Sequence, residues 1–254
     1  MKLDHIYQER TLILAHRGAS GHAPQNTLAA FLMAAEMGAD GVELDVHLSA
    51  DGEAVVIHDD TVDATTDGHG RVSRMTMSEI ASLDAGSWFD PRFAGQRIPT
   101  LAQVFELLGP RLLINVEIKV ELGHHPFAHE AEVVRLIEDH HLVDRVVVSS
   151  FTPSALRRVR KLNPHIPLAL LYDKVQTNLF PRIASLLGTP YDLLHPSFKV
   201  VDALYVQHAH AHDRRVNVWT VNREEDMRRM VDAGVDGIIT NYPDRLRDIL
   251  ADAG

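Results

Sequence analysis

Apolar runs in this sequence end repeatedly at residues that can transfer protons or bind anions. The run Leu12–Ala15 leads into His16 and Arg17, and the run Ala54–Ile57 leads into His58. Two imidazoles can accept and donate protons near neutral pH, and a guanidinium group matches the equatorial oxygens of a phosphate. These side chains predict proton transfer on a phosphate-containing substrate.

Two further segments carry charged side chains two residues apart. Glu43 and Asp45 lie in DGVELDVHLS, and Glu117 and Lys119 lie in LLINVEIKV. Alternate residues of a strand point to the same face, so each pair shares one face. The three carboxylates make an oxygen-rich site for a hard divalent cation, Mg²⁺ or Ca²⁺. The ammonium group of Lys119 and the guanidinium group of Arg17 can both bind a phosphate. A metal ion, two cationic side chains and two histidines are together typical of phosphodiester cleavage.

Each motif also has a purely structural interpretation when it is taken alone. An E-x-D pair can belong to a surface face, and His16 can be a hydrogen-bonded core histidine. Glu117 and Lys119 can form a structural ion pair across a barrel. The functional interpretation is favoured because the motifs occur together: all of these residues fall where the strands of one parallel barrel would end.

Trp219, in NVWTVN, lies on the predicted strand Val216–Val221, and Asn217 faces the same way. A polar neighbour on one face of a strand favours a wet pocket over a core position for the indole ring.

Several clusters of histidines and acids are predicted to be solvated. In HAHAH, His208 and His212 share one face of the predicted helix Ala203–His212, but no acidic residue stands between them as in H-E-x-x-H. The same prediction covers the doublets His124-His125 and His140-His141, and the acids Asp59, Asp60, Asp63 and Asp67.

The elements that must position these side chains alternate along the whole chain. Short apolar runs are followed by segments of helical periodicity, which predicts parallel strands with crossover helices. If Gly41–His58 is one strand with a hairpin-like extension, about eight βα units remain in the 254 residues. The prediction is therefore a (β/α)₈ TIM barrel. A doubly wound open sheet fits less well, because HRGASGHAPQNT lacks the G-x-G-x-x-G turn.

Residues 59–99 interrupt this alternation with a polar, turn-rich stretch that holds one short predicted helix near Ser78–Leu83. The stretch is too long for an ordinary βα loop, so we predict a small insertion after the second strand. No linker or repeat divides the chain, and residues 1–254 are predicted to form a single domain.

Composition excludes several classes of function. The formal net charge of −10 argues against binding to nucleic acid. The chain has no cysteine, so it has no disulfides, and zinc is a less suitable metal. The sequence before His16 holds only a four-residue apolar run, and no segment is long and apolar enough for stable membrane insertion. These features predict a cytoplasmic location.

Taken in order, the motifs resemble those of the glycerophosphodiester phosphodiesterase family. The similar segments cover nearly the whole chain, and they are AHRGASGHAPQNTLAAF, GADGVELDVHLSADGEAVVIHDDTVDATTDGHGRV, IPTLAQVFELL, NVEIK, NVWTVN and GVDGIITNYPDRL. The resemblance implies a TIM barrel with an insertion after the second strand. It implies metal-dependent hydrolysis of glycerophosphodiesters, such as glycerophosphocholine or glycerophosphoethanolamine, to sn-glycerol 3-phosphate and an alcohol.

The resemblance also implies a role for each matching residue. His16 and His58 correspond to the acid–base pair, and Arg17, Lys119 and Trp219 to substrate-binding residues. The metal ligands for Mg²⁺ or Ca²⁺ correspond to Glu43, Asp45 and Glu117. One position departs from the family, which usually has P-E-N-T where this chain has Gln25. Glutamine keeps the reach of glutamate without its charge, which puts a charged role at this position in doubt.

Two alternatives to this function remain open at the level of sequence. Related barrels act on lysophospholipids or other phosphodiesters, and Trp88, Phe89 and Phe93 of the insertion offer apolar surface for a lipid tail. A non-catalytic barrel that binds a phosphorylated ligand is disfavoured, because none of the expected residues is missing. The expected partner is a small-molecule phosphodiester. The sequence leaves the preferred alcohol, the order of proton transfer and the oligomeric state open, a homo-oligomer included.

Overall fold

The computed structural model describes residues 3, 5–7, 10–109, 111–119, 128–173 and 180–252. Within these ranges nine strands form one sheet in the order β1-β9-β8-β7-β6-β5-β4-β2-β3, and β1 also pairs with β2. That pairing closes the sheet. All neighbouring strands are parallel except β2 and β3. The predicted eight-stranded parallel barrel is confirmed.

The barrel strands are short and mostly buried, as strands covered by helices on one side and packed in a barrel on the other must be. The strands are β1 (Leu12–His16), β2 (Gly41–Leu48), β3 (Ala54–Val56), β4 (Leu113–Ile118), β5 (Val146–Ser150), β6 (Leu168–Tyr172), β7 (Leu193–Pro196), β8 (Arg215–Val218) and β9 (Gly237–Thr240).

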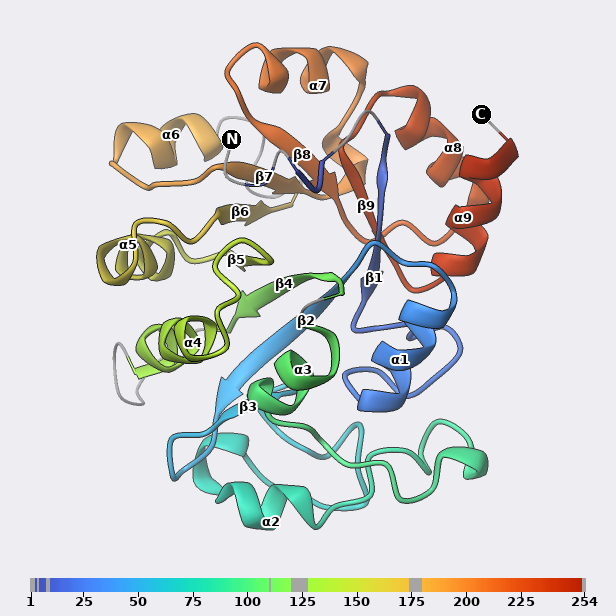
Figure 1. Ribbon diagram of the computed structural model, residues 1–254, viewed down its shortest axis with the longest axis vertical. Coiled ribbons are helices and arrows are strands. Elements are labelled where there is room, and N and C mark those ends of the chain that lie inside the picture. The colour runs from blue at the N-terminus through green and yellow to red at the C-terminus, as the bar shows by residue number, and fades with distance from the viewer. Residues whose placement is uncertain are drawn as a thin grey trace.

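Figure 1 shows the helices arranged around the outside of these strands. The helices are α1 (Leu28–Glu36), α2 (Met77–Ala81), α3 (Leu101–Leu108), α4 (Ala128–Asp139), α5 (Pro153–Leu162), α6 (Phe180–Leu186), α7 (Ala203–His210), α8 (Glu224–Asp232) and α9 (Pro243–Asp252). None of the helices within the described residues combines the length and hydrophobicity that a bilayer-spanning helix needs.

Several elements end earlier than the sequence predicts, among them one strand and one helix. The strand expected over Val216–Val221 stops at Val218, and beyond it a single parallel bridge joins Trp219 to Ser197. The helix expected to reach His212 stops at His210, and a turn with Asp213 at φ +54° leads the chain into β8.

The two faces of the strands differ in chemistry. Along β2, Val42, Leu44 and Val46 belong to the main hydrophobic cluster, which also contains residues of the outer helices such as Phe105. The alternate residues Glu43 and Asp45 therefore face the barrel interior. A second cluster fills the interior below them, and it includes Leu12, Leu14, Leu113, Val147, Leu193 and Ile239. The barrel is thus apolar inside except towards the carboxyl ends of its strands.

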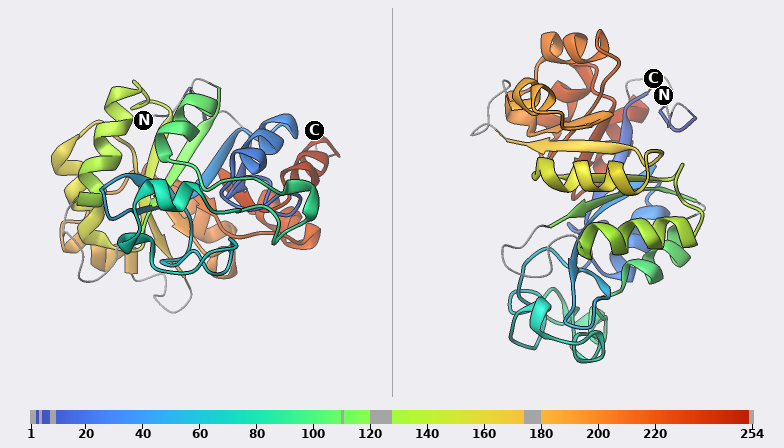
Figure 2. Two further views of the ribbon diagram at one scale, coloured as in Figure 1. Left: turned by 90° about the horizontal axis from the view of Figure 1, so that it is seen from below. Right: turned by 90° about the vertical axis from the view of Figure 1, so that its left-hand side faces the viewer.

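The polar stretch after β2 forms an insertion, as predicted. Strand β3 pairs antiparallel with β2, with Val56 opposite Val46, and the chain returns to the barrel at α3 only after α2. A separate small apolar cluster around Val62, Val72 and Ile80 stabilises this segment. Figures 1 and 2 show it at one end of the long axis, with α7 at the other.

The turn after β1 requires glycine, which gives a first prediction. Gly18 has φ +80°, and a Cβ there would lie 2.6 Å from the carbonyl carbon of Ala30. Gly18→Ala should therefore lower the free energy of unfolding by about 2–3 kcal/mol through strain and overpacking. Gly52→Ala is the matched control, because Gly52 has φ +89° with nothing within 4 Å, and should cost about 1 kcal/mol. Urea denaturation measures both, and equal losses would contradict the proposed clash.

Candidate active site

Three carboxylates converge inside the barrel at the carboxyl ends of β2 and β4. Asp45 lies opposite Glu117 in the strand register, and Glu43 lies beside His16 of β1. Each of Glu43, Asp45 and Glu117 offers an oxygen atom within 4.8 Å of the others, and all three side chains are buried. The structure therefore places the predicted metal ligands together.

If all three acids were ionised, they would carry more negative charge than Lys119 and Arg17 neutralise. Burial raises the pKa of Glu117 to about 7, and the charge of Asp45 adds to the increase. Burial also raises the pKa of Glu43 well above its ordinary value, with contributions from Asp45 and Glu117. A divalent cation would compensate this excess, and buried carboxylate oxygens are the donors that Mg²⁺ and Ca²⁺ prefer. The residues present fit a hard cation.

Two cationic side chains border the carboxylates. Lys119 Nζ lies 2.6 Å from Glu117 Oε1 and 3.0 Å from Asp45 Oδ1, and Arg17 Nε lies 3.2 Å from Asp45 Oδ2. Burial by itself would raise the pKa of Asp45, but the charges of Lys119 and Arg17 hold it below its ordinary value. Arg17 Nη1 also donates a hydrogen bond of 2.9 Å to Gln25 Oε1. The absence of the glutamate charge at position 25 puts a contact with Arg17 in doubt, but the neutral Gln25 still forms this contact through its hydrogen bond.

The two predicted histidines face the same site and have different partners. His16 Nδ1 lies 2.7 Å from the amide oxygen of Asn241, and His58 Nδ1 lies 2.6 Å from Asp59 Oδ1. Since both partner atoms are acceptors, each ring carries its hydrogen on Nδ1 and leaves Nε2 for other contacts. Burial lowers the pKa of His16 to about 4 and also lowers that of His58.

The two histidines, the two cationic side chains and two of the carboxylates border one cavity of about 230 Å³. Its polar side contains the histidines, Arg17, Glu43, Glu117 and Lys119, and its apolar side contains Phe151, Leu171, Trp219 and Ile239. The rings of Phe151 and Trp219 pack edge to face at 5.4 Å, and the indole nitrogen donates to the carbonyl oxygen of His195 at 2.7 Å. Trp219 therefore lines a pocket as predicted, although from the loop after β8.

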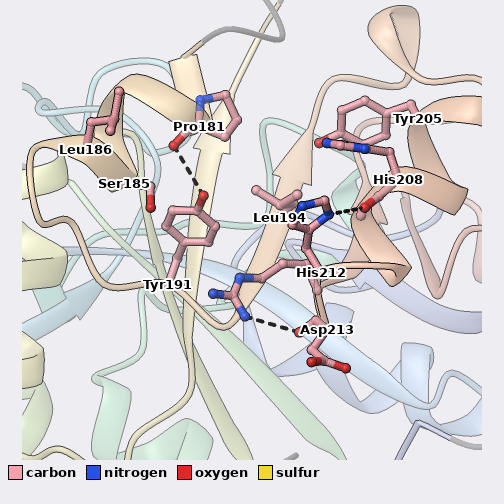
Figure 3. A pocket seen from close by; sticks show the side chains of 11 residues that line it. Pro181, Ser185, Leu186, Tyr191, Leu194, Tyr205, His208, His212 and Asp213 are labelled. Atoms are coloured by element: carbon pink, nitrogen blue, oxygen red, sulfur yellow. Dashed lines mark hydrogen bonds between the residues drawn. The ribbon is translucent and has the colours of Figure 1, made fainter.

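A larger hollow, of about 530 Å³, lies elsewhere, between α6 and α7. Figure 3 shows that Tyr191, His208 and His212 line it, with His212 Nδ1 bonded to the carbonyl oxygen of His208 at 2.8 Å. Both histidines are exposed, as predicted for HAHAH. Within the described ranges the only group of three or more possible metal-binding side chains is the carboxylate cluster of the barrel. The doublet His124-His125 lies outside the described residues.

Some residues of the site were not recognised from the sequence. The sequence predicts a solvated segment around Asp59, whereas in the structure this residue is the partner of His58. The adjacency of the two residues in HDD indicates such a contact. Of the four acids that are predicted to be solvated, Asp63 and Asp67 are exposed, whereas Asp59 and Asp60 are partly buried. Asn241 had no such signal, because it lies 225 positions from His16 along the chain.

A closed parallel barrel with clustered carboxylates, two histidines and two cations at its strand ends points to the class of TIM-barrel phosphodiesterases. Residues 16–245 match the glycerophosphoryl diester phosphodiesterase family. The chain belongs to this family and is a phosphoric diester hydrolase.

Individual relatives agree with this assignment. A glycerophosphodiester phosphodiesterase of Caldanaerobacter subterraneus is 44% identical over 246 residues, which cover 96% of this chain and 100% of the relative. A phosphodiesterase structure from Oleispira antarctica, in complex with the product sn-glycerol-3-phosphate, has a TM-score of 0.88 at 30% identity and covers 97% of this chain and 99% of its own. A glycerophosphodiester phosphodiesterase structure from Agrobacterium tumefaciens has a TM-score of 0.80 at 29% identity, with coverages of 94% and 99%.

Proposed function

We propose that this phosphodiesterase hydrolyses glycerophosphodiesters, such as glycerophosphocholine or glycerophosphoethanolamine, to sn-glycerol 3-phosphate and an alcohol, with Mg²⁺ or Ca²⁺ as its metal. The observation that carries the proposal is the cluster of three buried carboxylates, two of which, Glu43 and Glu117, line one cavity together with the two histidines. The product bound to the Oleispira antarctica relative supports the choice of substrate.

Glu43, Asp45 and Glu117 would hold the cation. When bound, it supplies Lewis-acid stabilisation of the charge that develops on the phosphate oxygens. Lys119 and Arg17 lie at the edge of this cluster, where an ammonium and a guanidinium group can bind the same phosphate. Trp219 and Phe151 form the apolar wall against which the carbon atoms of the substrate would pack.

The partners of the histidines favour a division of their roles. Asn241 is neutral and holds the Nδ1–H tautomer of His16, so Nε2 presents a lone pair to the pocket and serves as the general base. Asp59 is an acid at 2.6 Å and would stabilise the imidazolium form of His58, which suits the general acid that protonates the departing alcohol. The attacking oxygen is either the glycerol 2-hydroxyl, through a cyclic phosphate, or water, and both routes use these proton transfers.

A coupled assay for glycerol 3-phosphate tests the function directly. The enzyme should release it from glycerophosphocholine and glycerophosphoethanolamine. Lysophosphatidylcholine is the comparison substrate, with turnover followed as release of choline, because Trp88 of the insertion is 44% exposed and packs edge to face on Phe89. Preferential turnover of lysophosphatidylcholine would favour a lysophospholipase D activity. No cleavage of any phosphodiester, over several metals, would contradict the proposed function.

Cation binding should depend on pH. Metal ligands must be ionised, whereas the pKa of Glu117 is raised to about 7 without metal and that of Glu43 is also raised. Binding near neutral pH should therefore release protons, and the affinity should fall by about tenfold per pH unit below pH 7 for each proton displaced. Calorimetry in buffers of different ionisation enthalpy measures this release. Glu117→Gln should release fewer protons, and a pH-independent affinity would contradict the prediction.

A further inference from the structure

Asn115 is a buried polar residue of the pocket, and the proposed chemistry assigns no role to it. It lies on β4, two positions before Glu117 and opposite Glu43 in the register with β2, so it shares the inner face of the barrel with the carboxylates. The residue is 1% exposed and borders the same cavity as His16. It therefore sits one layer deeper than Glu117, at the base of the pocket.

The amide of Asn115 has no hydrogen-bond partner among the described residues. Both Oδ1 and Nδ2 are buried and unpaired. Other inward polar groups with an unpaired atom, Ser149, His195 and Asn217, do not border the cavity. Arg17 does border it, but its Nε lies 3.2 Å from an oxygen of Asp45. Since buried polar groups in proteins are nearly always hydrogen-bonded, a wholly unpaired amide beside a ligand pocket points to a partner in the ligand.

The chemistry of a primary amide narrows the choice of that partner. It offers a donor at Nδ2 and an acceptor at Oδ1, whereas a phosphate oxygen at neutral pH only accepts and a metal ion needs only an acceptor. A hydroxyl group donates and accepts, so it can satisfy both amide atoms. The neighbouring side chains already match the other parts of the substrate, with cations for the phosphate and aromatic rings for carbon.

We infer that Asn115 binds a hydroxyl group of the glycerol unit and so selects phosphodiesters whose retained alcohol is a polyol over simple alkyl or aryl esters. This inference rests on the proposed function and adds a substrate-binding residue to it. Asn115 acts in binding and takes no part in proton transfer.

The test compares two product-like ligands that differ only in their hydroxyl groups. Calorimetric titration of the metal-loaded protein with sn-glycerol 3-phosphate and with n-propyl phosphate measures the contribution of the hydroxyls in the wild type. Asn115→Leu should weaken binding of glycerol 3-phosphate by about ten- to hundredfold and leave that of propyl phosphate within about twofold. Asn115→Ser, which keeps a donor and an acceptor, should recover part of the difference.

The other outcomes overturn the inference. If Asn115→Leu lowers the affinity for both ligands equally, Asn115 only supports the fold. If the affinity for neither ligand changes, its amide binds water alone. If Asn115→Leu does not fold, Asn115→Ala and Asn115→Ser allow the same comparison. A failure of the proposed function is distinguishable, because the wild type would then release no glycerol 3-phosphate from any diester.

Discussion

Replacing His58 by alanine should lower kcat on glycerophosphocholine by about 10²–10⁴-fold, because the departing alkoxide loses its proton donor. The loss should be much smaller on glycerol 4-nitrophenyl phosphate, since 4-nitrophenolate leaves without protonation. His16→Ala should cost a similar factor on both substrates, because the attacking oxygen must lose its proton in either case. Release of glycerol 3-phosphate and of nitrophenol measures the two reactions.

The control for these variants is a histidine outside the site. His69 in the insertion has a side chain that is 86% exposed, and His69→Ala should keep kcat within about twofold. Near-full turnover of both His16→Ala and His58→Ala would refute the acid–base assignment. If the nitrophenyl substrate restores turnover of His16→Ala and not of His58→Ala, His16 is the general acid and His58 the general base. This would reverse the roles that the partners Asn241 and Asp59 suggest.

Removing divalent cations with a chelator should reduce turnover by about 10³-fold or more, and Mg²⁺ or Ca²⁺ should restore it. The size follows from the several kcal/mol by which a bound cation stabilises a phosphoryl transition state. Without it, the enclosed carboxylates would also repel an anionic substrate. Measurement of turnover against free metal concentration gives both the loss and the identity of the preferred ion.

Substitution of one carboxylate separates this effect from general damage. Glu117→Gln should raise the metal concentration needed for half-maximal activity by at least about tenfold. Glu130→Gln is a matched control, because Glu130 is equally buried but pairs with Arg158 at 2.8 Å on the outer helices. It should leave the metal requirement unchanged. A chelated enzyme that still cleaves at the full rate would refute the role of the metal.

The fold was largely predictable because its signal is local and repeated. Most strands are apolar runs, and the polar residues that interrupt β2 and β4 keep the period of two, as Glu43 and Asp45 do. Their inward orientation followed from the alternation with Val42, Leu44 and Val46, which lie in the outer core. Strand ends were less predictable, since they depend on pairing with neighbouring strands: β8 ends at Val218, and beyond it a single bridge joins Trp219 to Ser197.

By itself, the sequence determined the parallel barrel, the insertion and the residue types that gather at the strand ends, because hydrophobic period and motif spacing are properties of short segments. The tertiary structure decided which side chains become partners. The pairing of β1 with β9 brings Asn241 to His16 across 225 positions. The parallel register of β2 and β4 sets Asp45 against Glu117 and leaves the amide of Asn115 unpaired below them. Such contacts depend on the pairing of distant strands and on side-chain rotamers, which no local pattern encodes.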